Sequence, residues 1–155
     1  MQTFVIKNEK DLEKYKDDYG YHIEGHAEFE YSAEFTGRLL VDGYLYIEAG
    51  GYIEAGEYIE AGGYIKAGES SGIVAGLYIT CKTTLSFGLR AFAGTCSWRE
   101  ISDEDKTITC GKLEKGTIEY GILKETGLEE EKINSKKVTI KLDDGQTVTG
   151  TIIES

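Results

Sequence analysis

Apolar residues recur at every sixth position through the middle of the chain. Residues 46–69 are four consecutive copies of one six-residue pattern, in which Tyr and Ile are followed by a charged residue, Ala, Gly, and then Gly or Glu. The same apolar lane extends backwards in steps of six and contains Ile23, Phe29, Phe35, Val41, Ile47, Ile53, Ile59 and Ile65. A second lane, two residues later, contains Gly25, Tyr31, Gly37, Gly43, Ala49, Ala55, Ala61, Ala67, Ile73, Ile79, Leu85 and Ala91.

Two inward lanes separated by two residues indicate short β-strands, because successive side chains of a strand point to opposite faces. The glycines after each strand provide corners, whereas in an α-helix they would be destabilising and the six-residue period would spread over the whole surface. The pattern therefore predicts a mainly β fold: a β-solenoid with about three six-residue sides per coil. Residues about eighteen apart are then expected to stack, in two columns: Ile23, Val41, Ile59 and Leu77, and Phe29, Ile47 and Ile65.

The chain before the repeats predicts a strand and a capping helix over residues 1–22. Asn8 is placed to N-cap a helix that runs through Asp11 and Tyr15 to about Asp18 and is ended by Gly20. A solenoid needs such an element, because its first coil otherwise leaves an open apolar end.

The solenoid itself is expected over residues 23–98, with larger apolar residues from Phe92 to Trp98 closing its core. Residues 99–155 predict a β-rich cap or a small appended subdomain. Its predicted parts are an exposed loop at 102–106, strands at 107–113 and 117–123, and a C-terminal hairpin of 138–142 and 147–153 around Asp143-Asp144-Gly145.

The charge and the start of the chain limit the partners. A net charge of −11 argues against nucleic acid or an anionic membrane as a direct partner. There is no run of eighteen apolar residues, and the first residues lack the basic segment and long apolar run of a signal peptide. We therefore expect a cytoplasmic protein.

The sequence contains no catalytic or metal-binding constellation. Cys81, Cys96 and Cys110 are widely spaced, which favours small buried thiols over a disulfide framework or a metal site. The six-residue repeat resembles that of the hexapeptide-repeat acyltransferases, but their general-base histidine has no counterpart within residues 29–91, and His22 and His26 both lie at the first coil. We predict no enzyme activity, cofactor or metal, and the solenoid enzyme remains a third hypothesis.

The outward positions of the repeats are the candidate partner-binding surface. They carry Tyr46, Tyr52, Tyr58, Tyr64, Glu48, Glu54 and Glu60. In one interpretation, tyrosine simply favours strands and glutamate keeps the surface hydrated. In the other, the charge is functional: residues 22–70 contain ten acids and only Arg38 and Lys66 as bases, a net charge of −8. Over roughly 13 Å of stacked coils this is one net charge per about 1.6 Å, close to the ~1.7 Å of duplex DNA.

Two resemblances give different expectations for function. The aliphatic-x-small-Gly pattern of residues 23–91 resembles the repeat of the bactofilins, which implies end-to-end assembly into filaments. In fold and charge the chain also resembles acidic DNA mimics such as pentapeptide-repeat proteins and anti-CRISPR inhibitors carried by phages. That resemblance implies a basic nucleic-acid-handling protein as the partner. The elements flanking the repeats block the ends, so we expect a monomer or a small closed homo-oligomer rather than a filament.

Overall fold

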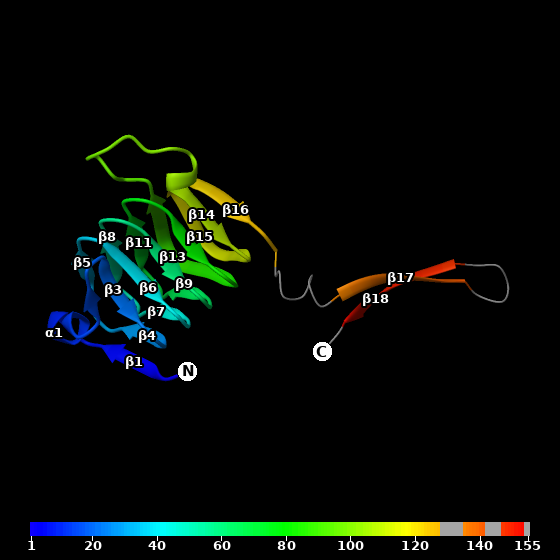
Figure 1. Ribbon diagram of the computed structural model, residues 1–155, viewed down its shortest axis with the longest axis horizontal. Helices are drawn as coiled ribbons and strands as arrows, with labels where there is room; N and C mark the ends of the chain where they lie inside the picture. Colours follow the sequence, from blue (N-terminus) through cyan, green and yellow to red (C-terminus); the bar gives the residue numbers. More distant parts are fainter. Residues whose placement is uncertain (128–134, 142–146, 154–155) are drawn as a thin grey trace.

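The computed structural model describes residues 1–127, 135–141 and 147–153. Figure 1 shows a stack of β-coils that begins at the blue strand β1 and ends at the yellow strand β16. The predicted β-solenoid is confirmed, with about five coils. Each coil has three sides, and the strands that form these sides pair in parallel with the strands one coil away.

The sides are numbered in chain order within a coil. The first side consists of β1 (Thr3–Ile6), β4 (His26–Phe29), β7 (Leu45–Ile47) and β10 (Ile65–Ala67). The second consists of β5 (Ala33–Phe35), β8 (Tyr52–Ala55) and β11 (Gly72–Ala75). The third consists of β3 (Gly20–Ile23), β6 (Arg38–Val41), β9 (Ile59–Ala61), β12 (Ile79–Cys81), β14 (Thr107–Cys110) and β16 (Ile122–Glu125). Two longer strands, β13 (Thr84–Ala93) and β15 (Lys112–Tyr120), run along the first side and continue round the corner onto the second.

The coil is two residues longer than predicted over most of its length. The first full coil has eighteen residues, with Ile23 beside Val41 and Phe29 beside Ile47. Through the middle coils the register is twenty: Ile59 pairs with Leu39 and Ile79, and Ile65 pairs with Leu45 and Leu85. After them the spacing varies, since β11 pairs with β13 eighteen residues later and β12 pairs with β14 twenty-nine residues later. The predicted stacking of Val41 on Ile59, Ile59 on Leu77, and Ile47 on Ile65 is therefore wrong.

The extra residues lie in the corner between the first and second sides. Three residues separate the inward-facing Phe29 and Ala33, but five separate the inward-facing Ile47 and Ile53. The second predicted lane is confirmed from Ala55 onwards, where all its members are buried. Before that point it is only partly right: Gly25 and Gly43 are buried, Tyr31 and Gly37 are half-buried, and Ala49 is exposed. The apolar inward partners there lie two residues before the first lane instead, at Tyr21, Ala27, Ala33, Leu39 and Leu45.

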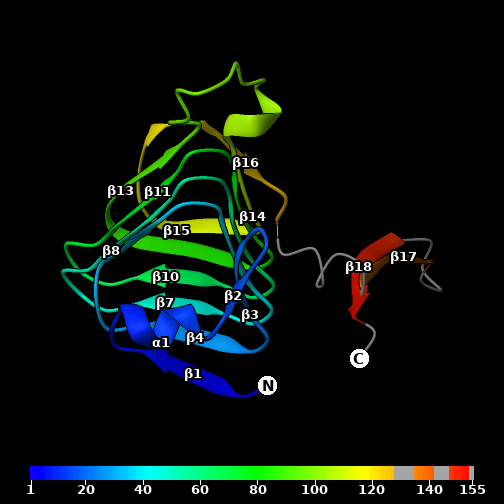
Figure 2. The ribbon, with the colours of Figure 1, turned by 60° about the vertical axis from the view of Figure 1, so that its left-hand side comes forward.

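The N-terminal end is capped by a helix shorter than predicted. The helix α1 (Glu9–Glu13) begins as expected, because the Asn8 side chain accepts a hydrogen bond of 3.0 Å from the Asp11 amide. It buries Leu12 against the core, and Figure 2 shows it at the N-terminal end of the coils, beside β1. It does not reach Asp18, because β2 (Lys16–Asp17) instead pairs antiparallel with the edge of β3.

The chain after residue 93 differs from the sequence prediction in two respects. Phe92 faces outward and is half-buried, and Trp98 is 62 % exposed, so these residues do not close the core. The predicted strands after residue 106 are interrupted at Gly111 and Gly121, and they stack in parallel on β12 and β13 as further turns of the solenoid. The exposed loop at 102–106 is confirmed and contains a short 3-10 helix, Glu104–Lys106.

The predicted C-terminal hairpin is confirmed as two antiparallel strands, β17 (Ser135–Lys141) and β18 (Thr147–Ile153). Its predicted turn at 143–145, together with Leu142, lies outside the described residues. Within the described residues, no helix is long and apolar enough to cross a membrane.

The inward and outward assignment can be tested on two neighbouring residues of β8. Ile53 is completely buried, whereas Tyr52 is 40 % exposed. Ile53→Glu places an unpaired charge in the core, a cost that is large compared with the ~5–15 kcal/mol stability of a typical domain. We expect this variant to be unfolded by circular dichroism and Tyr52→Ser to remain folded. Similar melting temperatures for the two variants would contradict the assignment.

The twenty-residue register can be tested at the corners. A Cβ on Gly76 would overlap the carbonyl oxygen of Gly56 in the coil below, whereas a Cβ on Gly50 would meet no atom within 4 Å. Gly50 has a φ of 80°, so Gly50→Ala should cost only the ~1–2 kcal/mol of a left-handed alanine. Gly76→Ala has to push two coils apart, and we expect a clearly larger drop in melting temperature. Equal drops in melting temperature would mean that the corners at Gly56 and Gly76 are not in contact.

Candidate functional site

The three predicted glutamates do not form one lane. Glu54 is exposed in the middle of β8, on the second side. Glu60 is half-buried on the third side, between Leu40 and Thr80 of the neighbouring coils. Glu48 is exposed in the corner after β7. The twenty-residue coil distributes these side chains around the solenoid instead of aligning them.

Two of the four predicted tyrosines are packed against aromatic rings of neighbouring coils. Tyr64 stacks on Tyr44 with ring centroids 4.8 Å apart, and Tyr58 stacks on Tyr78 at 4.7 Å. Such ladders stabilise adjacent strands, so these two tyrosines are explained by the interpretation in which tyrosine simply favours strands. Tyr46 lies on the first side and has a Lys66 neighbour in the next coil. Of these four tyrosines, Tyr52 is the one that lies in the same strand as a predicted glutamate, Glu54.

The second side carries two carboxylates in adjacent coils. Glu54 is the register partner of Glu34 on β5, and parallel strands lie only about 4.8 Å apart. The Tyr52 hydroxyl donates a hydrogen bond of 2.6 Å to Glu34. Within residues 1–127, neither carboxylate has an ion-pair partner. The side therefore presents two unneutralised charges at a fixed spacing.

The same outward lane becomes apolar in the later coils. Val74, Phe92 and Tyr120 follow Glu54 in register. Beside them lies a groove of about 490 Å³ lined by Gly50, Gly51, Tyr52, Ser70, Gly72, Val74, Leu89, Arg90 and Phe92. The second side is thus acidic near the N-terminal end and apolar further along.

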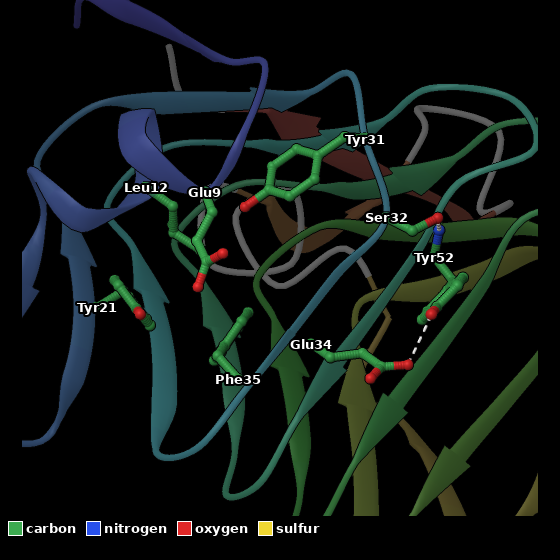
Figure 3. A pocket seen from close by; sticks show the side chains of 8 residues that line it. All are labelled: Glu9, Leu12, Tyr21, Tyr31, Ser32, Glu34, Phe35 and Tyr52. Carbon is green, nitrogen blue, oxygen red and sulfur yellow. Dashed lines mark hydrogen bonds between the residues drawn. The ribbon is translucent and has the colours of Figure 1, made fainter.

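A smaller cavity of about 250 Å³ lies at the acidic end, where α1 meets the second side. This acidic pocket is lined by Glu9, Leu12, Tyr21, Tyr31, Ser32, Glu34, Phe35 and Tyr52. Figure 3 shows Glu9 reaching down from α1 into the space between Tyr21, Tyr31 and Phe35. Tyr52 lines both this pocket and the apolar groove, so the two hollows adjoin.

Two tyrosines of the acidic pocket are partly desolvated and lie near carboxylates. Burial, together with a hydrogen bond of 2.9 Å from the Tyr21 hydroxyl to Glu13, raises the pKa of Tyr21 to about 12. Burial and the nearby carboxylates of Glu9, Asp11 and Glu13 also raise the pKa of Tyr31. Burial is the larger cause of both shifts and disfavours a charge of either sign, whereas the smaller contribution of the carboxylates favours a cation.

The histidines and cysteines considered in the sequence lie in surroundings that indicate structural roles. His26 accepts a hydrogen bond of 3.0 Å from the Tyr44 amide and stacks on the Tyr44 ring, and His22 lies 2.8 Å from Asp42. Cys81 and Cys110 are buried, with desolvation as the main cause that raises their pKa values to about 12 and about 11, whereas Cys96 is half-buried. The described residues contain no group of three or more His, Cys, Asp or Glu side chains arranged to hold a metal ion.

Comparison of the chain with protein-family models, with curated proteins and with solved structures found no match. Glu34 and Glu9 were missed in the sequence interpretation. Glu34 becomes detectable once the coil is twenty residues long, because it precedes Glu54 by that number.

Proposed function

We propose that the protein is a non-catalytic binding module whose acidic coils bind a basic, nucleic-acid-handling protein by charge mimicry. The observation that carries the proposal is the pair of Glu34 and Glu54, which are adjacent in register and have no ion-pair partner among residues 1–127. Like charges directly opposite each other destabilise a sheet, and a basic partner would remove that repulsion.

The scaffold suits mimicry because its charges are held at fixed positions. Parallel stacking keeps the coils about 4.8 Å apart, so Glu34 and Glu54 are held somewhat further apart than the ~3.4 Å between phosphates along one strand of duplex DNA. A basic channel that holds DNA or RNA offers lysines and arginines to such carboxylates. An inhibitor of the phage type, comparable to the anti-CRISPR proteins, would act in this way, and the cytoplasmic location expected from the sequence is consistent with such a partner.

The proposal is tested by removing equal charge from different sides. Glu34→Gln/Glu54→Gln and Glu48→Gln/Glu60→Gln each remove two charges and preserve side-chain size. Affinity capture from the native host followed by mass spectrometry identifies the partner, and competition with labelled duplex DNA or RNA measures its binding. We expect the first variant to bind about tenfold more weakly at low salt, with a smaller effect from the second.

Three outcomes separate the interpretations. Equal weakening in both variants would mean that net charge matters and the second side does not. Unchanged binding in both would leave the acidic coils as a hydrating surface. A partner that binds the solenoid and its nucleic acid simultaneously would overturn charge mimicry. Melting temperatures of both variants serve as the folding control.

End-to-end assembly of the bactofilin type remains a second candidate function, favoured by the C-terminal end of the solenoid. Leu113, Ile118 and Leu123 of the last coil are only partly buried, and within residues 1–127 no strand pairs with the outer edges of β15 and β16. An unpaired edge is a template for another strand. The N-terminal end, in contrast, is covered by α1.

Because α1 packs against the core at the N-terminal end, we expect growth in both directions to be blocked. We expect light scattering to give a monomer or a small closed oligomer at all protein concentrations. Electron microscopy at high concentration provides the second measurement. Filaments whose length increases with concentration would contradict this expectation and favour the assembly function.

A further inference from the structure

We propose that the acidic pocket between α1 and β5 receives the side chain of one arginine from a protein partner. The inference rests on the proposed function, since it specifies how a basic partner is recognised. At about 250 Å³ the cavity is smaller than the ~300–1,000 Å³ of typical small-molecule sites, and it suits a single side chain better than a cofactor.

The acidic pocket carries negative charge. The residues lining the acidic pocket include two carboxylates, Glu9 and Glu34, and no lysine or arginine. Glu34 accepts its hydrogen bond from Tyr52, whereas the Glu9 side chain has no hydrogen-bond or ion-pair partner among residues 1–127. Both residues are exposed, so their carboxylates are hydrated in the free protein and accessible to a cation from a partner.

The aromatic walls of the pocket suit a planar cation. Rings of Tyr21, Tyr31 and Phe35 surround the space into which Glu9 projects (Figure 3). A guanidinium is planar, stacks on aromatic faces and has five N–H donors for separate carboxylates, whereas an ammonium is compact and strongly hydrated. The combination of aromatic walls and two carboxylates therefore selects arginine over lysine.

The position of the pocket connects it with the proposed binding surface. Glu34 lies beside Glu54 on the second side, and Tyr52 borders the acidic pocket and the apolar groove. An arginine held in the pocket would place the adjoining partner segment along the second side. The pocket thus sets the register of a partner that the remaining acids attract only by charge.

The test uses a short glycine–serine peptide with one central arginine, titrated into the isotopically labelled protein and followed by amide chemical shifts. Matched peptides carry citrulline or lysine at the same position. We expect shift changes in β5 and α1 that saturate with the arginine peptide. The lysine peptide should bind more weakly, and the neutral citrulline peptide should not bind. Equal or tighter binding of either control peptide would overturn the inference.

Variants locate the binding in the pocket. Glu9→Gln should weaken binding by about fivefold, while Glu48→Gln, an exposed glutamate outside the pocket, should leave it within about twofold. Tyr31→Leu keeps the charges and removes one ring, and it should also weaken binding. Diffuse attraction to an acidic protein would instead give equal losses for Glu9→Gln and Glu48→Gln and none for Tyr31→Leu. Melting temperatures confirm that each variant is folded.

The peptide titration requires no knowledge of the partner, so the two proposals can fail separately. If the protein does not bind the arginine peptide, but its partner binding depends on Glu34 and Glu54, the arginine pocket is wrong and the proposed function stands. If the protein binds the arginine peptide through Glu9, but its partner binding does not depend on Glu34 and Glu54, the arginine pocket stands and charge mimicry is wrong.

Discussion

The structure depends on parallel hydrogen bonding between successive coils, which brings each backbone within about 4.8 Å of the next. This spacing places the inward aliphatic residues in continuous columns, exemplified by Leu39, Ile59 and Ile79. It also brings corner backbones so close that Gly76 lies directly against Gly56. The same contact aligns outward side chains, so the positions of surface charges follow from the core register.

The sequence was sufficient for the fold class because the inward lanes alternate with glycine corners. It was insufficient for the coil length because the insertion in the corner after Ile47 is two residues long. Two residues are also the spacing of the two inward lanes, so a step of six from Ile47 still reaches a buried residue, Ile53. The periodicity looks unbroken although its phase has changed. A one-residue insertion would have moved every later apolar residue to the outside and been obvious.

This hidden change of phase explains why the candidate site was only partly predicted. The exposed Tyr52 and Glu54 follow from their positions in the repeat. Their neighbour Glu34 requires the twenty-residue coil, and Glu9 requires knowing where α1 packs, which depends on tertiary contacts outside the repeat. The helix was itself overestimated because local propensity around Tyr15 is overridden when Lys16 and Asp17 pair with β3.

The distribution of residues along the second side bears on whether its acids have a function. At the same outward position, successive coils carry Glu34, Glu54, Val74, Phe92 and Tyr120. Apolar residues are therefore compatible with this position of the coil, and the fold does not require glutamate there. Two adjacent glutamates instead introduce repulsion that the later coils avoid. Hydration alone would be achieved by separated charges, so their juxtaposition beside a pocket of aromatic rings favours a cationic partner over a purely hydrating surface.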